Sequence, residues 1–419
     1  MATRHRVVII GAGFGGLACA RALSDEPVDV VLIDRHNYHL FTPLLYQVAS
    51  CLLNPSEIAA PLRKIFRAVG NVRVRVGEVV DVDFDEKRVQ LADGDAIEYD
   101  DVVISLGSTT NYFGNDAIAK QVLGLKDLAQ AIQLRNHVLA CLERAALAED
   151  AAERMHHLTF CIIGGGPTGV EYAGALAELV RLVLPHEYPE IDPAAMRIVL
   201  LEGGDRLLPA FPTRLSRYAR TQLERRGVEV HTDALVANVG DKHVELRNGT
   251  TFSTATVVWT AGVRPTDLAE RLPVPHTQGR FDVDDHLRIR GVEHAYAFGD
   301  AAAGHDRHGN VLPMLSPPAM QGGRFVARDI VATREGRRQR AFRYRDKGTL
   351  ATIGRTAAVG VVGPFQFTGF IGWIVWLAVH LYYLIGFENR VRVLLRWAWY
   401  YVRYDRPVRA LIDAREPAA

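Results

Sequence analysis

The sequence predicts an α/β protein with two Rossmann-type folds, the second inserted into the first, followed by a C-terminal helical segment. One pattern occurs twice: a β-branched run, a glycine-rich turn, a helical stretch, and a second apolar strand ending in an acid. It spans residues 7–34 and again residues 159–202. Each copy is a βαβ unit of the kind that binds a dinucleotide. The C-terminal segment is predicted from residues 356–387, which contain no charged side chain apart from histidine.

Composition narrows the function classes. With 419 residues the chain exceeds what one hydrophobic core usually serves. Its 49 basic and 48 acidic residues leave a net charge of +1, so no nucleic-acid partner is expected. The four cysteines lack CxxC spacing, which predicts neither a disulfide framework nor a metal site and favours a reducing compartment. The apolar run at residues 7–10 is too short for a signal peptide and suits a buried strand.

The first glycine cluster has the residues that a pyrophosphate site needs. Gly11 permits the tight turn, Gly13 lets a phosphate approach the backbone, and Gly16 lets helix pack on strand. The helix that follows offers free N–H groups and positive potential. Asp34, at the end of the next strand, is placed to bind an adenosine ribose. The alternative is a turn with a structural role only. The rest of this predicted site is Phe14, Gly15, Arg35 and Val79.

The second cluster, Gly164, Gly166 and Gly169, meets the same criteria with Glu202 as its acid. A carboxylate accepts hydrogen bonds from a ribose diol and repels a 2′-phosphate, so NADH is favoured over NADPH. Arg206 is near enough in sequence to weaken that preference. Ala261 and Gly262, which end a later strand, complete the predicted second site.

The two halves look like duplicated modules. After each βαβ unit, short alternating strands precede an apolar strand that ends in glycine, at Gly107 and at Gly262. One more buried strand, residues 295–299, stops at Asp300. Asp300 could cap a helix. With two dinucleotide folds present, it could instead bind the ribityl and pyrophosphate region of FAD.

These motifs together resemble the type II NADH:quinone oxidoreductases, single-subunit NADH dehydrogenases of respiratory membranes. The resemblance covers nearly the whole chain, and its more specific stretches are residues 39–49, 319–324 and 380–386. The matching stretches are residues 11–16, 39–49, 164–171, 259–265, 297–300, 319–324 and 380–386. The resemblance implies an FAD domain from residues 1–120 and 285–330, an NADH domain from residues 121–284, and a C-terminal region from residues 331–419.

The resemblance also implies two catalytic residues. Glu171 resembles the carboxylate that faces the flavin where nicotinamide and quinone meet, although a glutamate here is also favoured by the helix dipole alone. Gln321 resembles the last glutamine of an AQxxxQ-like stretch beside the quinone ring. The sequence departs from the family where the first glutamine is usual, because residues 316–318 are Ser-Pro-Pro. The quinone contacts are therefore the least constrained part of the prediction.

Rival redox chemistries require cysteines that this chain lacks. Disulfide reductases of the superfamily use a CxxxxC pair near the first motif, and Tyr46 stands where the partner of Cys51 would be. Sulfide:quinone oxidoreductases also need cysteines near the flavin, whereas Cys141 and Cys161 lie in or just before the second module. Electrons should therefore leave the flavin directly to a diffusible acceptor.

The tail predicts which acceptor is reachable. Glycines break the uncharged stretch, leaving residues 373–385 short for a membrane span. Residues 388–409 contain six arginines and two acids, an excess of about four positive charges, among leucines and aromatic residues. This composition suits an amphipathic helix in the headgroup layer of an anionic leaflet, within a membrane-anchoring segment of residues 360–409. A buried dimer interface is the alternative, and the resemblance allows both.

The predicted function is hydride transfer from NADH to FAD and two-electron transfer on to a quinone, without proton pumping. The predicted location is the cytoplasmic face of the cell membrane, held peripherally as a monotopic protein. Two alternatives stay open: a soluble NADH oxidase or ferredoxin-reductase-like flavoprotein, and a membrane-tethered redox sensor that does not turn over.

Overall fold

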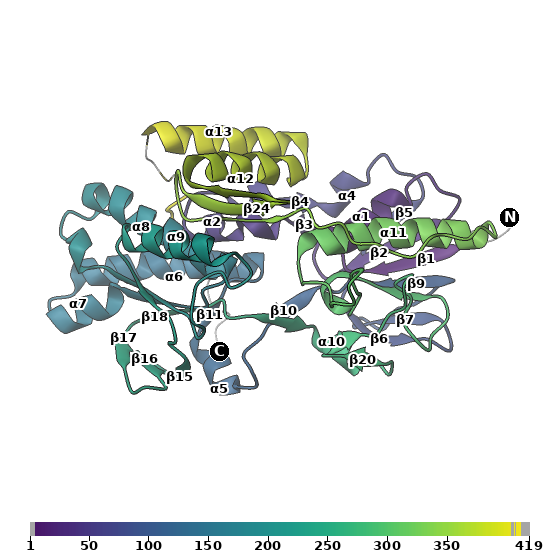
Figure 1. Ribbon diagram of the computed structural model, residues 1–419, viewed down its shortest axis with the longest axis horizontal. Coiled ribbons are helices and arrows are strands. Elements are labelled where there is room, and N and C mark those ends of the chain that lie inside the picture. Colours follow the sequence, from purple (N-terminus) through teal and green to yellow (C-terminus); the bar gives the residue numbers. More distant parts are fainter. Residues whose placement is uncertain (1–4, 404–405, 407, 412–419) are drawn as a thin grey trace. The chain divides into compact units, whose positions relative to one another are not determined.

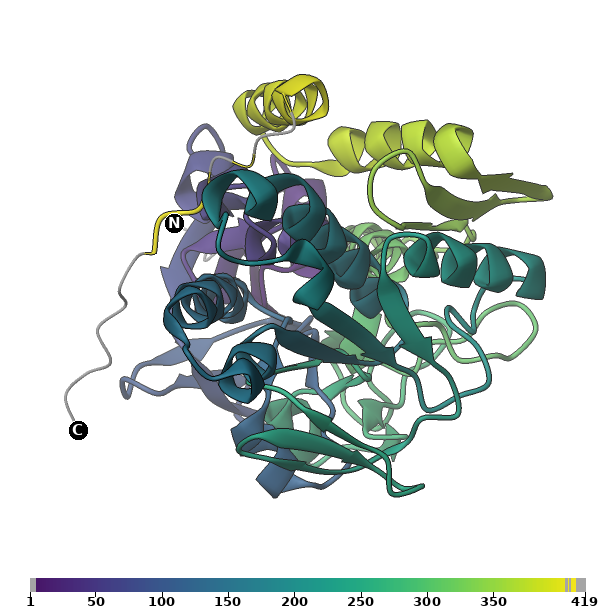
Figure 2. The ribbon, with the colours of Figure 1, turned by 90° about the vertical axis from the view of Figure 1, so that its left-hand side faces the viewer.

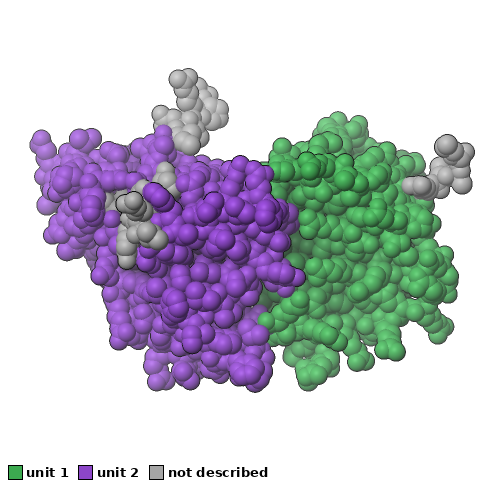
Figure 3. Space-filling model, turned by 90° about the horizontal axis from the view of Figure 1, so that it is seen from above, with its two compact units in different colours: residues 1–40, 59–109, 263–347 green, residues 41–58, 110–262, 348–419 purple. Residues whose placement is uncertain are grey.

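The computed structural model describes residues 5–403, 406 and 408–411. Its backbone contacts divide the chain into two compact units, which Figure 3 colours separately. Unit 1 contains Met1–Leu40, Ala59–Thr109 and Val263–Lys347. Unit 2 contains Phe41–Ile58, Thr110–Gly262 and Gly348–Ala419. Each unit is therefore assembled from segments that are far apart in the sequence.

Unit 1 is built on a parallel sheet of five strands. The strand order is β22-β9-β1-β2-β5. The bounds are β1 Arg6–Ile10, β2 Asp29–Asp34, β5 Val72–Val76, β9 Asp101–Ile104 and β22 Ala295–Ala297. Ile10 pairs with Ile33 and with Ile104, so the three central strands end together at the edge where the glycine turn follows. The β-branched residues of β1 are buried, as expected for a strand covered on both faces.

Helices α1 (Phe14–Ala22) and α11 (Ser316–Arg334) lie side by side against this sheet (Figure 1). The antiparallel element β6-β7-β8 and the pair β3-β4 complete the larger structures of unit 1. The remaining bounds are β3 Tyr38–Leu40, β4 Ala59–Pro61, α4 Leu62–Ile65, β6 Val79–Asp83, β7 Arg88–Leu91, β8 Ala96–Glu98, β10 Ser108–Thr110, β19 Val263–Pro265, α10 Asp267–Arg271, β20 His276–Thr277, β21 Arg280–Phe281 and η3 Gly299–Ala301.

Unit 2 repeats this plan. Its parallel sheet has the order β11-β18-β12-β13-β14, and Ile163 pairs with Leu201 and Trp259 as Ile10 pairs with its neighbours. The bounds are β11 Leu123–Gly124, β12 Thr159–Ile163, β13 Arg197–Leu201, β14 Val228–His231 and β18 Thr256–Trp259. The predicted duplication of a Rossmann-type fold is therefore confirmed.

The other elements of unit 2 surround that sheet. Strands β15, β16 and β17 form the matching antiparallel element, and their buried residues join those of the sheet in one core. The bounds are η1 Thr42–Leu44, α2 Leu45–Ala49, α3 Pro55–Ile58, α5 Asp116–Gln121, α6 Leu128–Leu147, α7 Ala151–His157, α8 Pro167–Glu187, η2 Pro193–Ala195, α9 Thr213–Glu224, β15 Val236–Gly240, β16 His243–Leu246 and β17 Thr251–Ser253.

The C-terminal segment folds as an antiparallel sheet followed by two helices. The sheet contains β23 (Thr349–Thr352), β24 (Ala358–Val362) and β25 (Phe365–Thr368), and α12 (Gly369–Tyr383) packs on it, as Figure 2 shows. Helix α13 (Phe387–Arg403) follows. Within the described part of the chain, no helix combines the length and the apolar character that crossing a bilayer requires.

The compact units differ from the expected domain boundaries in five segments. Residues 110–120 were expected in the FAD domain but group with unit 2, and residues 331–347 were expected in the C-terminal region but group with unit 1. Residues 263–284 were expected in the NADH domain but group with unit 1. Residues 348–411 were expected in a separate region but group with unit 2, together with residues 41–58. The physical reason is burial: Trp373, Trp376 and Trp397 of the tail are 7%, 1% and 2% exposed within unit 2. Burying such large apolar side chains stabilises their attachment by a few kcal/mol, about 2 per residue.

Candidate functional site: two dinucleotide cradles and a buried carboxyl

The first glycine turn is shaped for a ligand that approaches its backbone. Gly11 has a φ of +95°, and the amide of Gly11 donates to the carbonyl of Ile33 at 2.8 Å. A side chain at Gly16 would overlap the Gly11 carbonyl, so only glycine lets α1 start so close to β1. A side chain at Gly13 would meet no atom within 4 Å, which leaves space above the turn. Gly13 is the N-cap of α1 and has no side chain to bond the first-turn amides, which suits an anion.

Asp34 ties this turn to the end of β2. Its Oδ2 accepts a hydrogen bond from the Ala12 amide at 2.7 Å and its Oδ1 accepts one from the His36 amide at 2.8 Å. A carboxylate has about four lone-pair sites, so both oxygens can still accept from ribose hydroxyls. Arg35 is exposed beside it, and Val79, partly buried, begins β6. The geometry fits an adenosine ribose at Asp34.

Asp300 lies inside η3, which begins after its N-cap residue Phe298. The capping alternative is therefore wrong, because a capping aspartate stands at the N-cap and accepts from the helix amides. Asp300 Oδ2 instead accepts a hydrogen bond from the Ser108 hydroxyl, which follows β9. Since β9 and β22 are neighbours in the sheet, Asp300 faces the same sheet edge as Gly11 and Asp34.

The second turn repeats the first almost atom for atom. Gly164 has a φ of +111°, a side chain at Gly169 would overlap the Gly164 carbonyl, and one at Gly166 would meet nothing within 4 Å. Glu202 Oε2 accepts from the Gly165 amide at 2.6 Å, and its Oε1 accepts from the Gly204 amide at 2.7 Å. The sequence-predicted residues of this cradle are thus brought together.

Two further residues of this cradle follow β18. Ala261 packs against Gly164, and Gly262 has a φ of +118°. Arg206 donates from Nη2 to the carbonyl of Pro209 at 3.2 Å. The guanidinium is thus engaged by the backbone of its own loop, while Glu202 holds the position next to the glycine turn.

Two hydroxyl side chains that were not predicted from the sequence bond the backbone of the two glycine turns. Ser105 Oγ lies within hydrogen-bond distance of two carbonyl oxygens, at 3.0 Å from Ile10 and 2.9 Å from Gly11. Thr260 Oγ1 lies in the same way 2.9 Å from the Ile163 carbonyl and 3.1 Å from the Gly164 carbonyl. The signal was present, because both hydroxyls stand two residues before the glycines that end the duplicated strands.

Glu171 lies on α8, directly after the second glycine turn, and is 8% exposed. Its Oε1 accepts hydrogen bonds from the Thr352 amide and from the Trp376 indole Nε1, both at 3.2 Å. Burial raises the pKa of Glu171 to about 8, and the two hydrogen bonds act in the opposite direction. A carboxyl with such a pKa can hold or release a proton near neutral pH.

Aromatic and polar side chains pack around this carboxyl. Trp376 stacks on His380 with ring centroids 4.0 Å apart and contacts the ring of Tyr46 at 6.4 Å. Burial lowers the pKa of His380 to about 4, so its ring is neutral at physiological pH. Gln47 donates to the Tyr46 hydroxyl at 2.9 Å and accepts from Trp397 Nε1 at 2.9 Å. The helices of the tail thus reach into the interior of unit 2.

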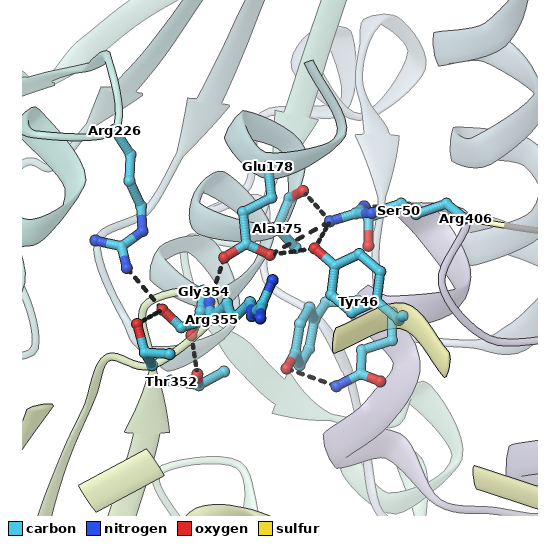
Figure 4. A network of polar contacts seen from close by, with 12 residues as sticks. Tyr46, Ser50, Ala175, Glu178, Arg226, Thr352, Gly354, Arg355 and Arg406 are labelled. Atoms are coloured by element: carbon cyan, nitrogen blue, oxygen red, sulfur yellow. Dashed lines mark hydrogen bonds and ion pairs between the residues drawn. The ribbon is translucent and has the colours of Figure 1, made fainter. Parts of the chain in front are cut away.

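A second polar cluster lies two turns along α8. Glu178 accepts from the Arg355 amide and from the Tyr400 hydroxyl at 2.7 Å, and the Arg406 guanidinium is 3.6 Å away (Figure 4). Arg406 is fully buried and also donates to the carbonyls of Ser50 and Ala175. The cluster joins Tyr400 and Arg406 to α8.

Gln321 lies on α11 of unit 1. Its amide is engaged in both directions by Arg345, donating to the carbonyl at 2.9 Å and accepting from the amide at 3.0 Å. A ligand that needs the Gln321 N–H can use the second hydrogen of the NH₂ group. Glu171 belongs to unit 2, so the two predicted catalytic residues are carried by different units.

Comparison with known proteins identifies the family. The sequence pattern of the pyridine nucleotide-disulphide oxidoreductases matches residues 5–323. Two type II NADH:quinone oxidoreductases of Mycobacterium tuberculosis, Ndh and NdhA, are 38% and 36% identical to the chain. The alignments cover 94% of the chain, and 87% and 86% of those proteins. The chain belongs to the type II NADH:quinone oxidoreductases.

The fold agrees with this family. The structure of NDH2 from Plasmodium falciparum in complex with NADH superposes with a TM-score of 0.89 at 20% identity, over 98% of the chain and 100% of that structure. The predicted class of enzyme and its α/β fold are confirmed. Type II NADH:quinone oxidoreductases are flavoproteins, so FAD and NADH are the cofactors.

The four cysteines are not suited to act as redox nucleophiles. Cys19, Cys51, Cys141 and Cys161 are all free and buried. Burial raises the pKa of the Cys51 thiol to about 11, and it raises the pKa of each of the other three thiols. A thiol acts as a nucleophile in its ionised form, so these cysteines are inert at neutral pH.

Proposed function

We propose that this chain oxidises NADH with FAD and reduces a quinone at a membrane surface, without ion pumping. The observation that carries the proposal is Glu171, a buried carboxyl with a pKa near neutrality that follows directly on a dinucleotide cradle. Quinone reduction consumes protons as well as electrons, so a residue that holds a proton near this cradle is what the reaction needs.

The first cradle holds FAD. Gly11, Gly13 and the start of α1 receive the pyrophosphate, Asp34 binds the adenosine ribose, and Asp300 binds the ribityl and pyrophosphate region. Phe14, Gly15, Arg35 and Val79 border this site. When bound, FAD accepts a hydride and passes on two electrons, which is chemistry that no side chain supplies.

The second cradle holds NADH. The start of α8 receives the pyrophosphate, and the Glu202 carboxylate accepts hydrogen bonds from the ribose diol while repelling a 2′-phosphate. Ala261 and Gly262 border the nucleotide. Unlike a bound prosthetic group, NADH must enter and leave in each cycle, so it is the substrate of this cradle.

The quinone gains two electrons and two protons, of which one derives from the NADH hydride. Glu171 supplies the other proton and takes a replacement from solvent, and Gln321 orients the quinone ring through its amide. Burial raises the pKa of Glu171 to about 8, so the carboxyl still holds its proton near neutral pH and can give it to a quinone that is being reduced. Ser-Pro-Pro at residues 316–318 leaves Gln321 as the glutamine of this stretch.

Helices α12 and α13 attach the protein to lipid. Phe370, Ile371 and Ile374 on α12 are 59%, 65% and 45% exposed. On α13, Val393, Trp397 and Tyr400 face inward, whereas the exposed side presents large apolar residues together with Glu388, Arg390 and Arg392 near its start. Its large exposed apolar residues are Phe387, Val391, Leu394, Leu395 and Trp399. An exposed face of this kind fits the acyl boundary of a bilayer.

The arginines contribute less to this attachment than the sequence implied. Arg396 pairs with Glu57, Arg406 with Glu178, and Arg409 with Glu187. Arg392 pairs with Glu388, and Arg390 donates to the last carbonyls around the end of α12. Acids from other segments therefore offset most of the positive charge, and apolar insertion dominates the attachment. The attachment is peripheral, at the cytoplasmic face of the cell membrane, and a second copy in the membrane could share part of this face.

A steady-state assay tests the proposal. Purified protein with NADH and a short-chain quinone should turn over repeatedly, and NADPH in a parallel assay should be at least about tenfold less effective. A redox sensor would be reduced once and stop. An oxidase would consume NADH equally fast without quinone. Either result contradicts the proposed function.

Membrane attachment has its own test with exposed residues. Ile371→Ser combined with Leu395→Ser should lower binding to neutral lipid vesicles by about tenfold or more, because two large apolar side chains leave the bilayer. Leu147→Ser is the matched control, since Leu147 is 82% exposed on α6. Vesicle sedimentation measures binding, and an unchanged double variant would contradict attachment by this face.

A further inference from the structure

The two hydrogen bonds that Glu171 receives end on the same oxygen. Thr352 N and Trp376 Nε1 both donate to Oε1 at 3.2 Å. In a protonated carboxyl the carbonyl oxygen accepts and the hydroxyl oxygen carries the proton. Two N–H donors on Oε1 therefore make Oε1 the acceptor and leave Oε2 as the oxygen that carries the proton.

The Trp376 indole cannot swing away from this position. It is 1% exposed, it stacks on His380 at an interplanar angle of 23°, and it contacts the ring of Trp397 at 5.9 Å. His380 is itself held by a 2.7 Å hydrogen bond from its Nδ1 to the carbonyl of Trp376. The donor is fixed by packing on several sides, which is what holding another residue requires.

We propose that Trp376 is the positioning residue of Glu171, fixing Oε2 as the proton-bearing oxygen and setting the pH range over which the carboxyl releases its proton. This inference rests on the proposed function, in which Glu171 supplies a proton to the quinone. Trp376 touches neither reactant in this scheme, and it acts through Glu171. The residue lies on α12, so a helix with a lipid-facing surface also controls an interior carboxyl.

Other charged groups do not account for this control. Titratable side chains on the elements around the carboxyl are Tyr46 on α2, His380 on α12 and Tyr401 on α13, with Glu178 further along α8. At neutral pH the first three are uncharged, because burial raises the pKa of the tyrosines and lowers that of His380. The charge of Glu178 is offset by Arg406.

The direction of the effect follows from the bond. An N–H donor stabilises the ionised carboxylate more than the neutral acid, so it lowers the pKa of Glu171. Removing the indole N–H should therefore raise the pKa of Glu171. A hydrogen bond to a charged group corresponds to a shift of about one pKa unit.

The test compares two tryptophans that each lose one indole N–H. Trp376→Phe removes the donor to Glu171, whereas Trp397→Phe removes the donor to Gln47 from the same aromatic cluster. The readout is the infrared band of the protonated carboxyl, assigned by its loss in Glu171→Gln, and titrated with pH in the full-length holoenzyme. Trp376→Phe should move the midpoint upward by about one unit, and Trp397→Phe by less than a few tenths. If Trp376→Phe loses its flavin, Trp376→Met replaces it, because methionine fills irregular space without an N–H.

The outcomes separate the inference from the function it rests on. Equal midpoints in the two variants would overturn the inference. A shifted midpoint supports it, and the alkaline limb of kcat should shift with it while KM for NADH stays constant. If the infrared midpoint shifts but kcat does not follow, Trp376 still sets the protonation of Glu171, and the proton-donor role under the proposed function fails instead.

Discussion

The two cradles share a backbone and differ in what covers them. Gly15 of the first cradle is buried under the Phe298 ring and the Ala319 carbonyl of α11, and a side chain added at Gly15 would meet both. Thr168, at the matching position of the second, is exposed. One turn geometry can thus be buried under a second helix or left open. We expect the covered cradle to retain its nucleotide and the open one to exchange it.

The acids of the two cradles show the same contrast. Both carboxylates bond the amide of the second residue of the glycine motif and an amide two residues further along the chain. After Asp34, the ring of His36 stacks on Tyr38. After Glu202 come Gly203 and Gly204, both exposed. The second ribose position is therefore bordered by bare backbone, which suits a nucleotide that enters and leaves.

The largest expected effect comes from the glycine that lies under each turn. Gly16→Ala should lower flavin content more than about tenfold, because the new methyl overlaps the Gly11 carbonyl. Gly169→Ala should keep its flavin and lose reduction by NADH. Flavin absorbance and its bleaching measure both, and Gly70→Ala is a control, since a methyl there meets no atom within 4 Å. Loss of flavin in both variants would break the division of labour between the cradles.

The next effect concerns the carboxyl that only the second cradle has, since Ala18 stands on α1 where Glu171 stands on α8. The pKa of Glu171 is raised from 4.5 to about 8, so the folded state binds a proton that the unfolded chain releases. This contribution is full below pH about 4.5 and falls by at most about 1.4 kcal/mol per pH unit until about pH 8. Glu171→Gln should remove this slope. Urea unfolding from pH 5 to pH 8 measures it, and parallel slopes in variant and parent would contradict it.

A smaller effect is expected at the second ribose position. Glu202→Gln keeps the size of the side chain but removes its charge, so kcat/KM for NADH should fall about tenfold and discrimination against NADPH should weaken. Arg206→Gln is the control and should leave the NADH value within about twofold, because Arg206 bonds its own loop. Equal losses with NADH and NADPH would show that Glu202 supports the loop without sensing the 2′ position.

The smallest effect tests whether the packing of Phe298 and α11 over Gly15 contributes to stability. Gly15→Ala should destabilise the holoenzyme by about 1–3 kcal/mol, because its methyl overlaps the Phe298 ring. Thr168→Ala, at the exposed matching position, should stay within about 0.5 kcal/mol of the parent. Denaturant unfolding measures both. Similar losses in the two variants would mean that the difference in cover has no energetic consequence.

The cradles could be predicted from the sequence because their chemistry is local. Turn, helix start and acid follow one another within a single βαβ unit, so spacing alone brings Gly11 near Asp34 and Gly164 near Glu202. The same locality explains why the duplicated sheets were predicted correctly. The distances between these residues are set within one βαβ unit, so patterns of neighbouring residues are enough to predict them.

The surroundings of Glu171 and the charge of the tail could not be predicted in this way. Trp376 reaches Glu171 from more than two hundred positions further along the chain, and nothing in its neighbourhood marks it as a donor. The tail arginines were counted against Glu388 and Asp405, which are their sequence neighbours. The fold adds three acids from other segments, Glu57, Glu178 and Glu187. Long-range pairing of charges depends on tertiary structure, which no count along the chain contains.

The buried Arg406 also bears on how the molecule is made. Its guanidinium joins the loop at Ser50 to helix α8 through Ala175 and Glu178, so unit 2 lacks part of its interior until this residue is present. On the ribosome, Arg406 is synthesised more than two hundred residues after Ser50, Ala175 and Glu178, the partners that it contacts. The interior of unit 2 is therefore completed late in biosynthesis, when the segment that follows α12 and α13 has emerged to join α2 to α8.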